Sequence, residues 1–152
     1  MSEFEPRDPD FERKVRESFA RQRVMSTIGA TLARIEPGLV EIALPFRVGL
    51  TQQHGYLHAG VAGTIADSAG GYAAFSLMPP GSTVLSVEYR VHLLAPAKGE
   101  RFLARGRVVR AGRTLTVCEL EVEAIEGEQR ARCVFGTQTL ICVPEAGDRP
   151  AG

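Results

Sequence analysis

The sequence has no surplus of charge of either sign. Its 152 residues include 18 Lys and Arg and 18 Asp and Glu, so the formal net charge at pH 7 is zero. Proteins that bind nucleic acids or anionic membrane surfaces usually carry a basic surplus, which is missing here. We therefore expect no nucleic acid and no membrane as partners, and any anionic ligand must be bound by a few local cations.

The sequence also lacks a secretion signal and an uninterrupted membrane-spanning segment. Residues 1–14 are acidic and polar, and the one long apolar run, residues 59–77, is interrupted by Asp67 and several glycines. We therefore expect a cytoplasmic protein. The length fits a single domain over residues 1–143, followed by a tail rich in Pro and Gly, residues 144–152, that we expect to be disordered.

Motifs for disulfide, metal and serine-hydrolase chemistry are missing as well. The three cysteines, Cys118, Cys133 and Cys142, form no Cys-x-x-Cys pair and lie in apolar segments, so we expect buried, reduced thiols. His54 and His58 have the spacing of helical zinc ligands, but a glycine lies between them and no third ligand is near, so no metal site is expected. No Gly-x-Ser-x-Gly motif occurs, which disfavours a serine hydrolase.

The first half of the chain predicts two helices and a hairpin. Apolar side chains recur every fourth residue after the Asp-Pro pair at positions 8 and 9, which predicts an amphipathic helix over residues 9–25. Two β-rich segments, residues 28–35 and 39–44, are joined by Glu-Pro-Gly and indicate a β-hairpin. A loop, residues 46–58, then leads to an apolar helix over residues 59–77, which the Pro-Pro-Gly that follows must end.

The second half predicts only strands. They are expected at residues 83–94, 102–109, 114–124 and 130–143. Short turns link them, so we expect an antiparallel meander. In the first strand apolar and polar side chains alternate, which places Leu85 and Val87 on one face and Ser86 on the other. One antiparallel sheet of about six strands wrapped around the apolar helix, an α+β fold, accounts for this order.

Asp67 is the one charged residue of the apolar helix. A helix that is apolar nearly all round is expected to be buried, and an ionised carboxylate there costs several kcal/mol unless it is paired, hydrogen-bonded or protonated. Carboxylates in such places often have a chemical role, although a structural carboxylate is the alternative. Asp67 is therefore the leading candidate for a catalytic residue.

The chain resembles the hotdog fold and, within it, the PaaI-like acyl-CoA thioesterases related to the phenylacetate-degradation thioesterase. That family has an Asn in the loop six residues before a His-Gly-Gly at the helix start, and an acidic residue two turns into the helix. The matching positions here are Gln52, His58-Ala59-Gly60 and Asp67. Residues 85–89 (LSVEY) and 94–99 (LAPAKG) also look like the family's sheet. Gln52 and Ala59 depart from the pattern, but a Gln keeps the amide and Ala59 keeps its backbone N–H.

Thioester hydrolysis needs donors for the developing oxyanion and a nucleophile or base for attack. The first N–H groups of the helix, at Ala59 and Gly60, are free donors at the positive end of the helix dipole. Asp67 is able either to attack the carbonyl or to activate a water, and both routes remain open.

The spacing along the helix predicts a shared site. Asp67 follows Ala59 by eight residues, about 12 Å at 1.5 Å per residue, whereas reacting atoms must come within about 3–3.5 Å. We therefore expect Asp67 of one subunit to meet the oxyanion site of another across a two-fold axis, in a homodimer. Small residues would allow the two helices to approach closely: Gly63, Ala66, Gly70 and Gly71. The resemblance adds that such dimers often pair into tetramers.

The resemblance also implies roles for further residues. Gln52 would orient the water or the thioester, His58 would line the pocket, and Ser86 would hydrogen-bond near the attacking group. The CoA part of the substrate would lie on sheet edges and turns, at Arg90, Lys98, Arg110, Gly112, Arg113 and Thr114. CoA belongs to the substrate, so no separate cofactor is expected. The loop also resembles a branch that acts on medium- and long-chain acyl-CoAs.

Three function classes remain open from the sequence. The leading one is an acyl-CoA thioesterase that releases a free acid and CoA. The second is a hotdog acyl-thioester dehydratase or hydratase, although the Pro-Gly usual at its helix entry is replaced by Ala59-Gly60. The third is a non-catalytic acyl-CoA-binding sensor.

Overall fold

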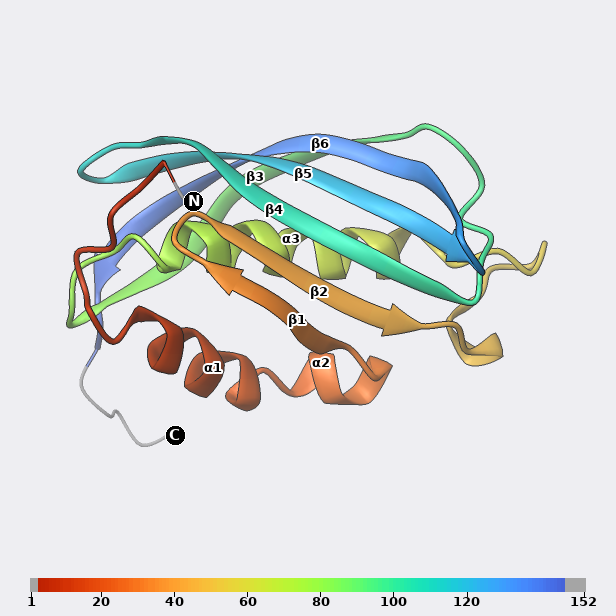
Figure 1. Cartoon of the computed structure of the whole chain (residues 1–152), viewed down its shortest axis with the longest axis horizontal. Coiled ribbons are helices and arrows are strands. Elements are labelled where there is room, and N and C mark those ends of the chain that lie inside the picture. Colours follow the sequence, from red (N-terminus) through yellow and green to blue (C-terminus); the bar gives the residue numbers. More distant parts are fainter. Residues whose placement is uncertain (1–2, 147–152) are drawn as a thin grey trace.

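The computed structural model describes residues 3–146 and consists of one antiparallel sheet with a long helix packed across one face (Figure 1). The N-terminal helices are α1 (Phe11–Arg21) and α2 (Arg23–Ile28), and the long helix is α3 (Ala59–Phe75). The strands are β1 (Thr31–Glu36), β2 (Leu39–Pro45), β3 (Ser82–Leu93), β4 (Arg101–Ala111), β5 (Leu115–Glu126) and β6 (Gln129–Pro144). The expected α+β hotdog architecture is confirmed. None of the helices within residues 3–146 is long and apolar enough to span a membrane.

The two ends of the predicted domain differ from expectation. The single helix predicted over residues 9–25 is broken at Gln22, whose extended backbone (φ −80°, ψ 90°) separates α1 from α2. The predicted tail begins too early, because Pro144 belongs to β6 and the Glu145 N–H donates to the Gly81 carbonyl oxygen at 2.9 Å. The rest of the predicted tail, residues 147–152, lies outside the described residues.

The order of the strands across the sheet is β1-β2-β4-β5-β6-β3. The predicted meander is therefore correct for β4, β5 and β6 but wrong for β3, which pairs with β6 at the far edge rather than with β4. The reason is that α3 carries the chain across the face of the sheet, and residues 94–100 carry it back to β4 (Figure 1). As a result β3 is an edge strand.

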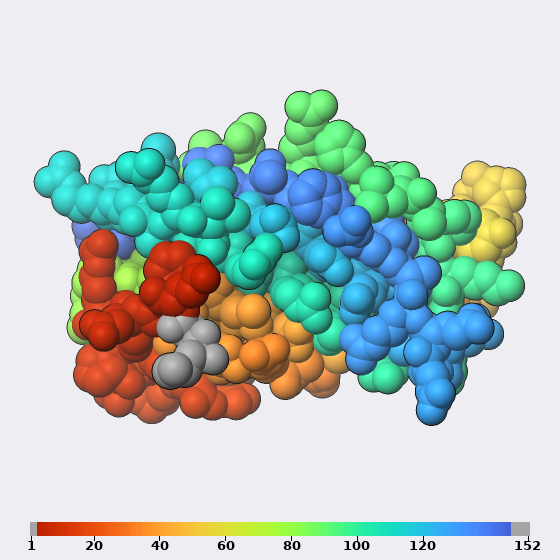
Figure 2. All heavy atoms as spheres, turned by 45° about the horizontal axis from the view of Figure 1, so that its top comes forward, coloured from red at the N-terminus to blue at the C-terminus, as the bar shows by residue number. Residues whose placement is uncertain are grey.

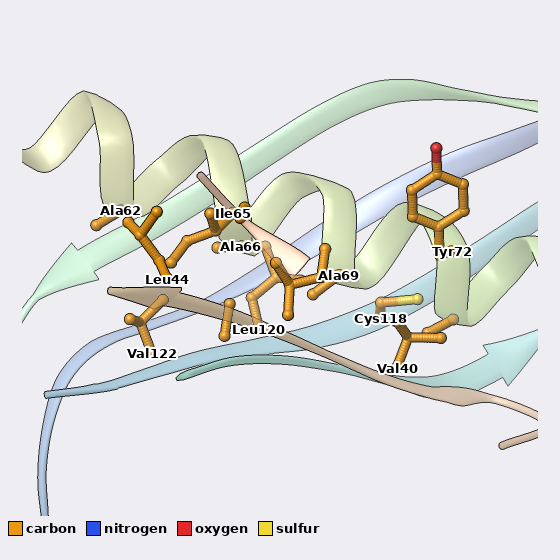
Figure 3. Close-up of a cluster of buried hydrophobic side chains, with 14 of the residues drawn as sticks. Val40, Leu44, Ala62, Ile65, Ala66, Ala69, Tyr72, Cys118, Leu120 and Val122 are labelled. Atoms are coloured by element: carbon orange, nitrogen blue, oxygen red, sulfur yellow. The ribbon is translucent and has the colours of Figure 1, made fainter. Parts of the chain in front are cut away.

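The core lies between α3 and the sheet. Leu44 and Leu120 of the sheet meet Ile65, Ala66 and Ala69 of the helix, and all five are fully buried (Figure 3). Complete burial of a Leu or Ile side chain contributes roughly 1.5–3 kcal/mol. The contact is closest at Gly106 of β4, where a Cβ would collide with the backbone of α3, so the sheet and the helix touch backbone to backbone. This contact fixes the height of the middle of α3 above the sheet.

One face of α3 is not covered, which corrects the prediction of a helix buried all round. Gly60 is exposed and a line of further residues is only partly buried: Val61, Thr64, Asp67 and Gly71. The neighbouring edge strand is also exposed, and its side chains project along the upper rim of the molecule (green in Figure 2). Leu85, Val87 and Leu93 are 57%, 58% and 60% exposed. Asp67 therefore lies at the boundary between the core and an uncovered apolar surface.

Candidate functional site

The loop before α3 is held in place by its own backbone and by Gln52. The amide oxygen of Gln52 accepts hydrogen bonds from the backbone N–H groups of His54 (2.6 Å) and Tyr56 (3.3 Å). The His58 N–H donates to the Leu50 carbonyl oxygen at 2.9 Å. The oxygen of the Gln52 side chain is thus already used, and its NH2 group, which has no partner among the described residues, is the part that can donate to a ligand.

The first turn of α3 offers one free N–H group rather than two. His58 is the N-cap residue, and its Nδ1 accepts the N–H of Gly60 at 2.8 Å. The prediction that the Gly60 N–H is free was therefore wrong, because a histidine at this position caps the helix. The N–H groups of Val61 and Ala62 bond to the His58 carbonyl oxygen at 2.9 and 3.1 Å. The N–H of Ala59 has no partner among the described residues and remains as the donor at the helix start.

A cavity of about 460 Å³ opens in front of this helix end. Gln52, His58 and Ala59 all line it, so the structure brings these three predicted residues together. Most of the remaining wall is apolar, and its residues include Leu57, Ala62, Leu93, Leu94, Pro96 and Val134. A cavity of this size and character suits an apolar group attached to a polar head.

Cys133 also lines this cavity but is not a nucleophile at neutral pH. Burial raises the pKa of its thiol, and the thiol donates to the Val122 carbonyl oxygen at 3.4 Å. Burial likewise raises the pKa of Cys118 to about 12. The expectation of buried cysteines is correct for these two, whereas Cys142 is only partly buried.

Asp67 is hydrogen-bonded by two neutral side chains. The hydroxyl of Ser86 donates to its Oδ1 at 2.7 Å, and the amide NH2 of Gln138 donates to the same oxygen at 2.6 Å. The structure thus brings Asp67 and Ser86 together, and the roles that the resemblance implies for them stay predictions. Gln138 was not a sequence candidate. The sequence feature that could have identified Gln138 is its place in the alternation of β6. It is a polar residue on the inward-facing side of the strand, between Gly136 and Leu140.

A β-bulge turns Ser86 towards the helix. The pairing of β3 with β6 shifts between Ser86 and Glu88, so that Ser86 and Tyr89 face inward while Leu85 faces outward. The predicted alternation is confirmed for Leu85 and Ser86, which lie on opposite faces of β3, but it does not continue through Val87. The extra residue of the bulge is Val87, and it reverses the face on which the preceding residues lie.

Within one chain the two groups of candidate residues lie in different pockets. Asp67 and Ser86 line a small pocket of about 150 Å³ together with Gln22 and Tyr72, and none of the residues around the Ala59 cavity belongs to it. This arrangement agrees with the separation of about 12 Å along α3 that the sequence predicted.

The residues expected to bind CoA are exposed but are not gathered in one place. Arg110, Gly112, Arg113 and Thr114 lie at the turn between β4 and β5, and Lys98 lies in the connection between β3 and β4. Arg90 is on the outward side of β3. None of the four basic side chains has an ion-pair partner among the described residues. Within residues 3–146 no three His, Cys, Asp or Glu side chains come together in a way that could hold a metal ion.

The comparisons with known proteins identify the family. The model of the thioesterase superfamily matches residues 54–131, about half of the chain. A crystal structure of a thioesterase family protein from Silicibacter pomeroyi has a TM-score of 0.87 and 48% sequence identity, and the match covers 89% of this chain and 99% of that one. A 1,4-dihydroxy-2-naphthoyl-CoA hydrolase of Listeria monocytogenes is 25% identical over 99 residues, 65% of this chain and 80% of that protein.

The fold agrees with a further structure. The Escherichia coli PaaI protein from the phenylacetic acid degradation operon has a TM-score of 0.79 at 14% identity, over 90% of this chain and 96% of that one, which is a likeness of fold alone. Fold and comparisons together define a hotdog enzyme of the thioester hydrolase class. The chain belongs to the thioesterase superfamily.

Proposed function

We propose that the protein hydrolyses an acyl-CoA to the free acid and CoA, at a site shared between two subunits. The observation that carries the proposal is the free N–H of Ala59 at the start of α3, which opens onto a largely apolar cavity of about 460 Å³. A backbone donor on the wall of a largely apolar cavity suits a developing oxyanion, and removing such a donor from known enzymes typically costs about 10²–10³ in kcat.

Asp67 of the partner subunit supplies the attacking group in this proposal. It acts as general base on a water or as nucleophile on the thioester carbon, and in both routes the C–S bond breaks and CoA leaves as the thiol after it takes up a proton. Ser86 holds the carboxylate, the NH2 group of Gln52 orients the water or the thioester, and His58 keeps the helix start in place through its cap on Gly60.

The uncovered surfaces support a dimer with this geometry. The edge strand β3 leaves backbone groups and apolar side chains exposed, and the uncovered line on α3 lies beside it. A two-fold axis beside β3 would bring Asp67 of each subunit towards the cavity of the other. Pairing of two such dimers into a tetramer is the further assembly that the family resemblance implies.

The cavity wall favours an apolar acyl group, and the aryl-CoA named for the Listeria monocytogenes relative shows that an aromatic acyl-CoA is a substrate within this set of relatives. We propose an aryl or a medium- to long-chain acyl group. The candidates for contact with the phosphates of CoA are Arg90, Lys98, Arg110 and Arg113, with Gly112 and Thr114 at the same turn as the last two. Because they lie at separate places on one chain, one CoA would contact only some of them. No other cofactor is required.

The test is release of free CoA thiol by the purified protein from a panel of short aliphatic, aryl and long-chain acyl-CoAs. The matched variant is Asp67→Asn, which keeps the shape of the side chain and removes its charge. We expect turnover by the wild type and a loss of about two or more orders of magnitude in the variant, with the same circular dichroism spectrum. If the wild type binds acyl-CoA without releasing thiol, the hydrolase proposal fails, and a change in enoyl absorbance would identify a dehydratase instead.

The shared site has its own test. A second variant, Ala59→Pro, removes the one free N–H at the helix start, and proline is tolerated in the first turn of a helix. Mixing inactive Asp67→Asn with inactive Ala59→Pro should restore activity, because some heterodimers then contain one intact site. If mass spectrometry shows that the subunits have exchanged and the mixture is still inactive, a site built from two chains is contradicted.

A further inference from the structure

We propose that Gln138 is a positioning residue, which determines the oxygen of Asp67 that acts on the substrate. The inference rests on the function proposed above, in which the carboxylate of Asp67 performs the attack. Gln138 lies on β6, 71 residues from Asp67 in the sequence, and its side chain reaches the carboxylate from the sheet side of α3.

The hydrogen bonds give the two carboxylate oxygens different environments. The Nε2 of Gln138 lies 2.6 Å from Oδ1 of Asp67 and 3.0 Å from the hydroxyl oxygen of Ser86, and Ser86 itself donates to Oδ1 at 2.7 Å. Two donors thus converge on Oδ1. The other oxygen, Oδ2, has no partner among the described residues, so it is the oxygen with free lone pairs for a water proton or a carbonyl carbon.

Neutral donors are also the only stabilisation that the surrounding pocket offers to the charge. The pocket beside Asp67 is lined by residues of α1, α3, β3 and β6 and by Gln22, and none of them is Lys, Arg or His. Its only other ionisable side chain is Tyr72, whose hydroxyl lies 3.3 Å from that of Ser18 and whose pKa is raised by burial. Gln138 and Ser86 are therefore the two side chains that hold the Asp67 carboxylate in place.

Packing alone does not favour a glutamine at this position. Gln138 is only 1% exposed, and its Oε1 is buried without a hydrogen-bond partner. An unpaired buried carbonyl is unfavourable, so an apolar side chain of the same length would suit the core better. Gly70 of α3 provides the space for the amide, because a Cβ at that position would overlap with Oε1. The glutamine at position 138 and the glycine at position 70 are thus both unfavourable for the stability of the core. Together they allow the amide of Gln138 to reach Asp67.

The direct test is Gln138→Met, which keeps the length of the side chain and removes its donors together with the unpaired oxygen. We expect a melting temperature within about 4 °C of the wild type or above it, kcat lowered about tenfold or more, and KM changed less than about twofold. The midpoint of the acidic limb of the kcat/KM profile should rise, because the charged form of the attacking group has lost a donor. Thr139→Val, at the next residue on the opposite face of β6, is the control and should leave all four quantities unchanged.

A merely structural role for Gln138 would lower the rate at every pH without moving the acidic midpoint. An unmoved midpoint therefore overturns the proposal, whatever the change in stability, and so does a kcat within about twofold of the wild type. A titration of the Asp67 carboxyl carbon by NMR, with Asp67→Asn to assign the signal, separates this inference from the proposed function. If the wild type hydrolyses no thioester, the function fails. The inference about Gln138 then stands or falls on whether the NMR midpoint rises in Gln138→Met.

Discussion

Gly70→Ala tests the tight packing between α3 and the side chains of the sheet beneath it. An alanine in a helix interior is ordinarily more stable than a glycine by about 0.8–1 kcal/mol, so helix propensity alone predicts a gain. The structure predicts a loss, because the new Cβ would lie 2.5 Å from the Leu120 Cδ2 and closer still to the Gln138 Oε1. Carbon atoms in contact are normally about 3.5–4.0 Å apart, so one of the layers must move by about 1 Å.

The expected magnitude follows from these opposing terms. Overpacking of a close-packed core typically costs about 1–3 kcal/mol, and displacing the buried amide of Gln138 from its partners costs a further 1–3 kcal/mol or so. After subtraction of the propensity gain of about 1 kcal/mol, Gly70→Ala should be destabilised by roughly 1–5 kcal/mol. The adjacent Gly71→Ala is the matched control, because its Cβ would meet only the Leu140 Cδ2 at 3.7 Å, an ordinary contact. It should gain about 0.5–1 kcal/mol.

The assay is equilibrium unfolding in urea, followed by circular dichroism at one fixed protein concentration, since oligomers unfold in a concentration-dependent way. Both variants gain the same helix propensity, so the difference between their free energies of unfolding measures the cost of the steric clash at Gly70 alone. If Gly70→Ala unfolds at the same urea concentration as Gly71→Ala or higher, then the helix does not rest on Gln138 and Leu120 as described. The catalytic rate of Gly70→Ala should also fall, because the displaced amide no longer holds Asp67.

Two further predictions concern the pH dependence of stability at Asp8 and the reactivity of the three cysteine thiols. The N–H of Asp10 and, more weakly, Lys14 hold the pKa of Asp8 below its usual 3.8. This contribution to stability is complete above pH 3.8 and is lost as the pH falls through the lower folded value, so Asp8→Asn should cost on the order of 1 kcal/mol at pH 7 and progressively less towards pH 2, by thermal unfolding. In native protein at pH 8, a thiol reagent should modify Cys142 first and leave Cys118 and Cys133 unmodified until denaturant is added, and mass spectrometry of both samples checks this. Fast modification of all three would contradict the burial of the last two.

Local patterns were sufficient to predict the elements but not all of their neighbours. The four strands after α3 were predicted because their apolar periodicity and short turns are encoded within each segment. The pairing of β3 with β6 was not predicted. Both β4 and β6 are compatible antiparallel partners for β3, and the choice between them depends on the path of α3 across the sheet. The break at Gln22 was missed for a similar reason, since glutamine has good helix propensity and the kink is set by tertiary contacts such as the bond from the Ser68 hydroxyl to the Gln22 amide oxygen at 3.0 Å.

In the candidate site, too, the residues that are close in the sequence were placed together correctly, whereas contacts between distant segments did not follow from local patterns. Gln52, His58 and Ala59 form one short segment, so a sequence motif was enough to place them around one cavity. Ser86 faces Asp67 only because of the bulge at Val87, and no residue type in that stretch demands a bulge. The cap that His58 forms on Gly60 depends on one rotamer of the histidine, which the sequence does not encode by itself.

The small residues of α3 have a different role from the one predicted. Ala66 and Gly70 are buried on the sheet side of the helix, and Gly63 lies beside Tyr89, whose hydroxyl oxygen a Cβ there would approach to 3.4 Å. They allow the helix to approach its own sheet, so they are not available for close packing against a second helix. The part of α3 left for a partner subunit is the partly buried line that includes Thr64, Asp67 and Gly71. A dimer that covers this line necessarily encloses Asp67, and because Oδ1 is already occupied on the sheet side, the oxygen left for a ligand in such an interface is Oδ2.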